Sequence, residues 1–299
     1  MLRGRRKQLP LYMMILPGFL LLVLFSYLPM FGITIAFQKF IPARGIFGDQ
    51  KWIGLGNFEY VMKLPSFFGI IRNTVTISLW KIIFGLTVPM TIAILINEVQ
   101  NNTLKRGIQT VVYLPHFLSW VVLGGIFIDM FSPTDGLVNN IIKALGGKPI
   151  FFLGDNQWFP FTMVFTETWK EFGYGTIVYL AAITGIDPCI YEAAQIDGAN
   201  RWKQTLHVTL PGMRMVIVLL AVLSLGNLLN AGFDQIFNMY SPPVYESGDI
   251  IDTFVYRIGL LDSQFGVATA VGLFKSLISL LFISTAYFCA YKFADYRLF

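Results

Sequence analysis

Long apolar blocks alternate with short polar connections along this chain. A helix needs roughly 20 residues to cross a hydrocarbon layer of about 30 Å, and six blocks are long enough to do so. They lie at about residues 11–37, 73–97, 107–131, 157–183, 212–233 and 268–292. Helices are expected because a backbone in lipid must satisfy its hydrogen bonds within its own segment. The pattern predicts an all-α integral membrane protein with about six transmembrane helices.

The first apolar block follows a tail with four basic residues. These are Arg3, Arg5, Arg6 and Lys7. The same order is typical of a secretory signal, but the block at 11–37 exceeds the roughly 7–15 apolar residues of a signal. We therefore expect a retained first span. Basic residues beside the first span favour the cytosolic side, so a cytosolic N-terminus is predicted and, with six spans, a cytosolic C-terminus too.

The composition agrees with a membrane protein. Of the 299 residues, 55% are hydrophobic and only 13% are charged, whereas soluble domains carry about 25% charged residues. The net charge of +5 could indicate a nucleic-acid partner, but the basic residues lie mainly in the tail and short loops, with no continuous stripe. Membrane orientation explains them better. The two cysteines, Cys189 and Cys289, lack the spacing of a disulfide framework or a metal site.

The longest predicted cytosolic loop, at about 184–213, differs from the other connections. Asp187 offers an N-cap acceptor, and Pro188 suits the first position of a helix. Gly198 then interrupts the helical pattern. A second helical stretch is expected to follow and to end before Pro211, because proline disfavours helix at the residue before it. The loop therefore reads as two short helices joined by a glycine bend.

Side chains in this loop suit contact with a protein partner. Small residues allow close backbone approach, acidic residues provide charge, and large apolar residues provide anchors. They are, in that order, Ala193, Ala194 and Ala199; Glu192 and Asp197; and Ile196, Trp202, Leu206 and Val208. A cytosolic docking element has this character. An interfacial helix resting on lipid headgroups is the alternative, and the residues by themselves leave both interpretations open.

The same loop contains a family motif. Its residues are Glu192-Ala193-Ala194, Gly198, Val208 and Leu210-Pro211. In order and spacing they resemble the EAA loop of binding-protein-dependent ABC importer permeases, in which isoleucine usually stands at the position of Val208. Four further stretches, 52–58, 72–74, 233–237 and 265–272, are similar to carbohydrate-type permeases. The resemblance covers about residues 10–292 and is closest to the LplB-like polysaccharide and oligosaccharide permeases, relatives of the maltose type.

The resemblance implies a type I ABC importer permease fold with a cytosolic coupling-helix loop. Residues 1–68 would form a cytosolic arm, the first span and an external segment, and residues 69–299 a permease core of five spans. The loop would dock into an ATPase subunit, where Glu192 would pair with a basic residue and Gly198 would permit the bend. The docking residues would be Glu192, Ala193, Ala194, Asp197, Gly198, Ala199, Leu210 and Pro211.

The resemblance also implies partners and a location. Two ATPase subunits would bind ATP and Mg²⁺, and a second homologous permease would complete the pore. An external solute-binding protein would deliver an oligosaccharide or polysaccharide. The chain would lie in the bacterial cell membrane, and no cofactor is expected on the chain itself.

No residue pattern in the chain indicates catalysis. The segment 146–149, Gly-Gly-Lys-Pro, lacks the leading glycine and the Ser or Thr of a phosphate-binding loop. The two histidines, His116 and His207, have no nucleophile at a recognisable spacing and are expected to be structural. Neither a catalytic site nor a metal site is predicted, and ATP hydrolysis is expected on another chain.

Six ionisable residues fall within the predicted spans. They are Lys81, Asp129, Glu167, Lys170, Glu171 and Lys275. A charge facing lipid at the bilayer centre costs about 2.5–3.5 kcal/mol even on a lenient scale. Lys81, Asp129 and Lys275 are nearer the predicted outer ends of their helices, so we expect their side chains to snorkel to the interface.

The other three ionisable residues lie near the middle of the fourth span. Glu167, Lys170 and Glu171 share one helical face through their i, i+3, i+4 spacing, and Trp169 and Tyr174 lie close by. The charges could pair with one another inside the bundle. Alternatively, this face could line a water-filled path for a sugar.

The fifth predicted span has polar residues three or four positions apart. Ser224, Asn227, Asn230 and Asp234 would form a polar stripe on an otherwise apolar helix. Amide side chains offer both donors and acceptors to sugar hydroxyl groups, so the stripe is a candidate substrate path. Polar side chains can also hold neighbouring helices together, and this alternative stays open.

Two other functions remain as alternatives. The charged fourth span could belong to an ion-coupled secondary transporter, although no inverted repeat is visible in the sequence. The chain could also be an ABC importer permease for a solute other than a sugar, such as an amino acid or phosphate. The leading interpretation is the transmembrane permease subunit of an ATP-driven importer of oligosaccharides or polysaccharides.

Overall fold

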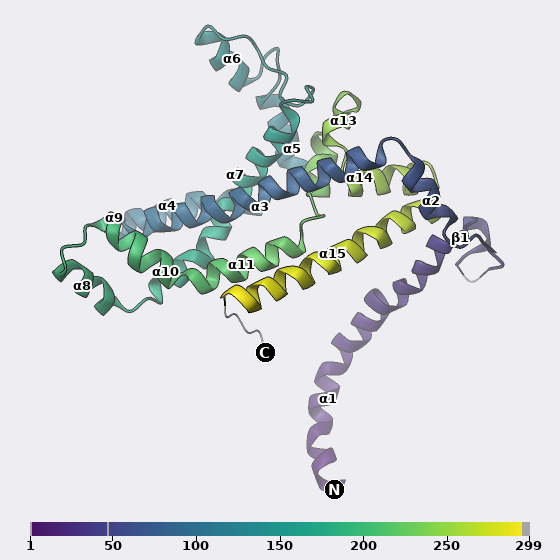
Figure 1. Cartoon of the computed structure of the whole chain (residues 1–299), viewed down its shortest axis with the longest axis horizontal. Coiled ribbons are helices and arrows are strands. Elements are labelled where there is room, and N and C mark those ends of the chain that lie inside the picture. The colour runs from purple at the N-terminus through teal and green to yellow at the C-terminus, as the bar shows by residue number, and fades with distance from the viewer. Residues whose placement is uncertain (1, 47, 295–299) are drawn as a thin grey trace. The chain divides into compact units, whose positions relative to one another are not determined.

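A computed structural model describes residues 2–46 and 48–294 of the chain. Helices dominate it (Figure 1). The α-helices are α1 (Leu2–Leu22), α2 (Gly56–Lys63), α3 (Phe67–Asn97), α4 (Asn102–Tyr113), α5 (Trp120–Met130), α6 (Leu137–Ala144), α7 (Phe159–Thr184), α8 (Pro188–Ile196), α9 (Arg201–Gln204), α10 (Leu210–Gly212), α11 (Arg214–Gly226), α12 (Phe233–Met239), α13 (Tyr245–Gly248), α14 (Ile251–Tyr256) and α15 (Phe265–Ala294). The π-helical turns are η1 (Val23–Tyr27), η5 (Thr205–Thr209) and η7 (Arg257–Leu261), and the 3₁₀ segments are η2 (Leu28–Phe37), η3 (Pro42–Arg44), η4 (Leu114–Phe117) and η6 (Pro242–Val244).

The chain forms two compact units. The first comprises the described residues of Met1–Phe67 and Val255–Lys275, and the second those of Phe68–Phe254 and Ser276–Phe299. The side chains of the basic N-terminal tail and of Cys289 lie outside the described set. The expected division into residues 1–68 and 69–299 stays a prediction.

The first unit contains the apolar stretch Tyr12–Phe37, which is long enough to cross a membrane. A small antiparallel ribbon follows, in which β1 (Gln38–Lys39) pairs with β2 (Lys51–Trp52). The sequence pattern does not predict this ribbon. The Asn57 amide donates to the backbone oxygens of Ala36 and Gln38, at 2.8 and 3.0 Å. That buried side chain therefore fixes the end of the first span to α2.

Three helices cover the second, fourth and sixth predicted spans without a break: α3, α7 and α15. Among the described residues, three stretches can cross a membrane by length and apolarity: Tyr12–Phe37, Phe67–Asn97 and Phe265–Phe288. Three further pairs of helices qualify only when each bent pair is counted as one span, which brings the number to six. The predicted helical membrane fold is confirmed apart from the small ribbon of β1 and β2, whereas the number of spans stays a prediction.

The predicted third span, at 107–131, is not one straight helix. The segments Asn102–Phe117 and Trp120–Met130 meet at 100°. Between them Leu118 is extended (φ −82°, ψ 136°), and the Ser119 hydroxyl oxygen accepts from the backbone N–H of Val122 as an N-cap. The prediction of a continuous helix is wrong here because a 3₁₀ turn containing Pro115 ends the first segment and a cap starts the second.

The predicted fifth span, at 212–233, is also broken. Helix α11 ends at Gly226, and α12 starts only after Gly232, which has a φ of +89°. The segment between them, 227–232, forms no regular helix. A left-handed residue cannot continue a right-handed helix, and glycine adopts this conformation at little cost.

The main core of the second unit lies where α5, α7 and α12 meet. Fully buried side chains such as Phe159, Met163 and Ile236 form it. Helices α5 and α12 pack closely, since a Cβ at Gly124 would lie only 3.1 Å from the Cβ of Asn238. This packing holds the start of α12, and with it the end of the break in the fifth span.

The loop at 184–213, predicted to be cytosolic, has the expected helix–bend–helix form. The Asp187 side chain accepts from the N–H of Cys189 at 2.9 Å, Pro188 starts α8, and Gly198 turns the chain with a φ of +75°. The predicted end before Pro211 is wrong, because helical structure continues to Gly212. The π-helical turn η5 precedes the proline, and a wider turn relieves crowding against preceding carbonyls.

Candidate functional site

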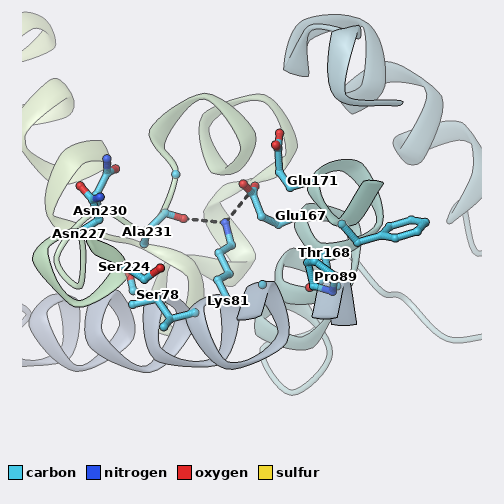
Figure 2. Close-up of a pocket in the computed structure, with 14 residues that line it drawn as sticks. Ser78, Lys81, Pro89, Glu167, Thr168, Glu171, Ser224, Asn227, Asn230 and Ala231 are labelled. Carbon is cyan, nitrogen blue, oxygen red and sulfur yellow. Dashed lines mark hydrogen bonds and ion pairs between the residues drawn. The ribbon is translucent and has the colours of Figure 1, made fainter. Parts of the chain in front are cut away.

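A cavity of about 340 Å³ lies between α3, α7 and the break in the fifth span (Figure 2). This volume falls within the usual range of small-molecule pockets, about 300–1,000 Å³. The lining residues are Ser78, Lys81, Ile82, Gly85, Pro89, Glu167, Thr168, Glu171, Phe172, Ser224, Asn227, Asn230, Ala231 and Gly232. Both polar groups and apolar surface are therefore available to a ligand.

Lys81 is the central cation of the cavity. Its ammonium lies 3.5 Å from Oε2 of Glu167 and donates to the backbone oxygen of Ala231 at 2.7 Å (Figure 2). It also donates to Oε1 of Gln235. An ammonium has three donors, so all three are used. The side chain is only 9% exposed. The prediction that it snorkels to the interface is wrong, because burial of a charge is tolerated where partners surround it.

Gln235 is the residue that connects this cation to the core. It is fully buried on α12, and its Nε2 donates to the oxygen of Met163 at 2.8 Å and to Oγ1 of Thr166 at 2.7 Å. The sequence pattern does not identify it as a site residue. In the sequence it is one amide side chain within the segment 233–237, and nothing in that segment indicates hydrogen-bond partners about 70 residues away.

The break in the fifth span places two amides beside the cavity. Asn227 follows the last residue of α11 and donates to the oxygen of Leu223, and the N–H of Asn230 donates to the oxygen of Asn227 at 2.8 Å. Gly232 ends the break close to the cation, since a Cβ there would lie 3.0 Å from Lys81 Nζ. A side chain at this position would displace the ammonium.

The prediction of a polar stripe along one continuous fifth helix is therefore wrong. Ser224, Asn227 and Asn230 do line the same cavity, but they reach it from a helix end and an irregular segment. Asp234 lies on α12 and does not line the cavity. Its backbone oxygen accepts from the Asn238 amide at 2.7 Å.

On the fourth span, the structure separates the five candidate residues. Glu167 and Glu171 line the cavity. Trp169 is outside the lining and meets Phe127 edge-to-face, with ring centroids 5.6 Å apart. Lys170 and Tyr174 are also outside it and lie with His116.

His116 forms a second polar cluster directly behind Glu171. Its Nδ1 lies 2.7 Å from Glu171 Oε2, and its ring stacks on Tyr174 with centroids 4.1 Å apart. Lys170 donates to Glu171 Oε1 at 2.6 Å and to the His116 oxygen at 3.1 Å, and its ammonium lies 5.6 Å from the Trp120 ring centre. Within the fourth span, Lys170 and Glu171 therefore pair with each other, whereas Glu167 pairs with Lys81 on α3.

The expected docking residues lie on the surface of the loop at 184–213. Glu192, Ala193, Asp197, Gly198 and Pro211 are exposed, and Ala194, Ala199 and Leu210 are half-buried. Two large apolar neighbours are strongly exposed, Ile196 at 87% and Trp202 at 72%. Arg201 pairs with Glu98 near the end of α3, which ties the second arm of the loop to a long helix.

The protein-family comparison decides the class of the chain. Residues 85–295 match the family described as binding-protein-dependent transport system inner membrane component. The chain belongs to this family. It is therefore a permease subunit of an ABC importer, a membrane component without enzymatic activity, and the alternative of an ion-coupled secondary transporter is excluded.

Curated relatives cover almost the whole permease. The polygalacturonan/rhamnogalacturonan transport system permease protein YteP of Bacillus subtilis (strain 168) is 40% identical over 95% of this chain and 88% of its own. Protein LplB of the same organism is 39% identical over 97% of this chain and 91% of its own. The resemblance to LplB-like permeases is confirmed.

Solved structures share the fold of this permease. A chain in the crystal structure of a bacterial ABC transporter involved in the import of the acidic polysaccharide alginate superposes with a TM-score of 0.90, at 36% identity over 97% of this chain and 98% of that chain. A second structure holds the alginate transporter in complex with an alginate pentasaccharide-bound periplasmic protein. It gives a TM-score of 0.89 at 36% identity, over 97% of this chain and 96% of that chain.

Proposed function

We propose that this permease moves an oligosaccharide or a polysaccharide segment through the bacterial cell membrane after an extracellular solute-binding protein delivers it. Relatives named for polygalacturonan/rhamnogalacturonan and for arabinooligosaccharides, and the structural neighbour named for alginate, support this cargo class. A non-sugar solute is the alternative.

The break in the fifth span is the observation on which the proposal rests. Irregular backbone at membrane depth is tolerated only where it is buried in protein or lines a water-filled cavity. Residues of the segment 227–232 line the cavity between α3 and α7, next to Glu167 and Lys81. We infer that this cavity belongs to the translocation path.

The lining chemistry suits a sugar. Ser224, Asn227 and Asn230 provide hydroxyl and amide groups, which can both donate to and accept from sugar hydroxyls. Glu167 and Glu171 provide carboxylate acceptors. Trp169, Lys170, Tyr174 and Asp234 lie outside the lining, so in this proposal they act by positioning the residues that line the path.

We further propose that the cytosolic loop docks into an ATPase subunit that binds ATP and Mg²⁺. The exposed Ile196 and Trp202 are large apolar side chains on a well-formed helix–bend–helix. Burying such surface stabilises a complex by about 25 cal/mol per Å², so a protein cleft is a favourable partner. Glu192 and Asp197 would pair with basic residues at its edge.

The complete importer would contain two such ATPase subunits and a second homologous permease that closes the other side of the path. Both termini would then lie in the cytosol, with residues 1–68 forming the arm, first span and external segment ahead of the core.

Reconstitution tests the proposed function. The permease, its second permease, the ATPase and the binding protein are placed in proteoliposomes, and uptake of mixed oligosaccharides is measured with and without ATP. ATP-dependent oligosaccharide uptake is expected. ATP-dependent uptake of amino acids or phosphate, with no uptake of any oligosaccharide, would replace the sugar by a non-sugar cargo.

A further inference from the structure

The cavity offers no uncommitted cation to a ligand. Among the lining residues, all of which the structure describes, Lys81 is the only cation. Its three donors already meet Glu167, Ala231 and Gln235. Lys170, which lies outside the lining beside Glu171, is also committed, because it donates to Glu171 and to the backbone oxygen of His116. An incoming anion would have to break one of these sets of contacts.

The two carboxylates of the cavity differ in whether an oxygen remains free to accept a hydrogen bond from a ligand. Both oxygens of Glu171 are engaged, one by Lys170 and one by His116. Glu167 uses Oε2 for Lys81, and within the described residues its Oε1 has no hydrogen-bond partner. The Glu167 side chain is 27% exposed. Glu167 therefore presents a free acceptor oxygen to whatever occupies the cavity. Lys81 compensates its charge, but with one lysine against two glutamates the lining residues carry a net negative charge.

The remaining polar groups near Glu167 are uncharged. Asn227 and Asn230 reach the cavity from the opposite side (Figure 2). Ser78 lines it too, and its buried Oγ has no hydrogen-bond partner within the described part of the chain. These groups can bind hydroxyls, but they cannot neutralise a carboxylate that enters a partly desolvated site.

We propose that Glu167 discriminates by charge, so that this permease's part of the path accepts uncharged sugar units and disfavours units that bear a carboxylate. The inference rests on the proposed function, because it assumes that the cavity is on the sugar path. Oε1 of Glu167 accepts from the hydroxyls of a neutral unit, which has no charge to repel. A uronate places a second negative charge beside Glu167 with no donor of Lys81 or Lys170 left to pair with it.

The discrimination separates this chain from the cargo named for its structural neighbour. The transporter of that neighbour is involved in the import of an acidic polysaccharide, and the relative YteP is named for polygalacturonan, which is also acidic, whereas the cavity here favours a neutral glycan or the neutral part of a mixed one. Fold similarity is uninformative on this point, because the sign of charge in a path depends on a few side chains and not on the backbone.

Sugar retention by the assembled transporter tests the proposal. The full complex in lipid nanodiscs is trapped with ATP and vanadate. The binding protein is left out, so that its own preference among sugars does not contribute. Two matched pools are applied: mixed oligouronides, and the same oligouronides after their carboxylates are reduced to primary alcohols. The two pools share chain length and linkage and differ only in charge.

Wild type is expected to retain the neutral pool preferentially. In Glu167→Gln, which keeps an acceptor for Lys81 and removes the charge, the ratio of acidic to neutral sugar retained should rise about tenfold, because removing a like charge relieves repulsion. Asp129→Asn is the matched control, since it removes an exposed carboxylate that does not line the cavity. Its ratio should equal that of wild type.

An unchanged ratio in Glu167→Gln, or retention of the acidic pool by wild type at least equal to that of the neutral pool, would overturn charge discrimination and leave the sugar path intact. Retention of neither pool by wild type would overturn the sugar path itself and this inference with it. The two failures are therefore distinguishable.

Discussion

The Lys81 ammonium lies 3.5 Å from the Glu167 carboxylate, although 86 residues separate them along the chain. The pair joins α3 to α7. The same ammonium also binds the backbone oxygen of Ala231 and the side chain of Gln235. One cation thus connects two long helices to the break in the fifth span and to the start of α12.

Removal of this cation should destabilise the permease. In Lys81→Met, Glu167 loses its counter-charge and two buried acceptors lose their donor. Breaking a buried ion pair by deleting one partner costs about 3–5 kcal/mol, and the partial exposure of Glu167 places the cost near the lower end. Thermal unfolding of the purified complex in detergent should show a clear loss of stability.

The double variant Lys81→Met/Glu167→Gln is expected to recover part of this loss, since it leaves no unpaired charge. Asp129→Asn is a control for charge removal alone and should unfold like wild type. Equal stability of Lys81→Met and wild type would show that the ammonium does not hold these elements together.

Sequence periodicity predicts the unbroken helices well. The apolar blocks that form α3, α7 and α15 are long and need no tertiary information to be recognised. The form of the loop at 184–213 could also be predicted, because Asp187 and Pro188 start a helix and Gly198 ends one through local chemistry. These features depend on neighbours in sequence.

The breaks at Leu118 and at 227–232 could not be predicted from hydropathy. Both breaks lie inside long apolar blocks, and the residue types found at them, such as Pro115, Asn227 and Gly232, also occur inside the unbroken helix α3. The buried position of Lys81 could not be predicted for a different reason. Its burial depends on Glu167 and Ala231, at sequence separations of 86 and 150 residues, and no local pattern encodes such a pairing.

Close packing of α4 on α7 gives a second prediction. A Cβ at Gly173 would lie 1.9 Å from the backbone oxygen of Val112, so Gly173→Ala must push the two helices apart. Overpacking of this kind typically costs about 1–3 kcal/mol. The thermal stability of the purified complex should fall.

Gly107→Ala on α4 is the matched control, since a Cβ there meets nothing within 4 Å. Alanine also has a better helix propensity than glycine, by about 1 kcal/mol, so this variant should be at least as stable as wild type. Equal behaviour of the two variants would contradict the close contact of α4 and α7.

Asn227 should affect transport more than assembly. Its side chain is exposed and lines the cavity, and among the described residues its amide donates only to the oxygen of Leu223, near the end of α11. We expect Asn227→Leu to lower ATP-dependent uptake several-fold without lowering the amount of assembled complex, because a polar contact to the sugar is lost while the core is untouched.

Asn140→Leu makes the same chemical change on the exposed side of α6, outside the cavity, and should transport at the wild-type rate. Uptake by Asn227→Leu equal to that of wild type at matched expression would remove Asn227 from the path.

Substitutions of Gly198 test whether the bend matters for the proposed docking of the loop at 184–213 on the ATPase. The φ of Gly198 is +75°, and a Cβ at this position would meet no atom within 4 Å, so a substitution there acts through backbone conformation alone. Alanine in this region costs about 1–2 kcal/mol, whereas asparagine tolerates it better. ATP hydrolysis stimulated by the loaded binding protein should fall in Gly198→Ala and fall less in Gly198→Asn.

Gly185→Ala lies at the start of the same loop with an ordinary φ of −83°, and stimulation should be close to the wild-type value in this control. The same low stimulation in Gly185→Ala and Gly198→Ala would indicate that the loop is sensitive to any added methyl group and not to the bend.

Cys189 provides a direct test of the orientation and of the docking surface. It is an exposed free cysteine on α8, three residues before Glu192. In a Cys289→Ser background, a membrane-impermeant maleimide should label Cys189 in inside-out vesicles and leave it unlabelled in right-side-out vesicles. Labelling should then fall when the ATPase subunit is bound, because α8 would be covered. Labelling from the external side would reverse the proposed topology, and unchanged labelling with the ATPase bound would place the docking surface elsewhere on the chain.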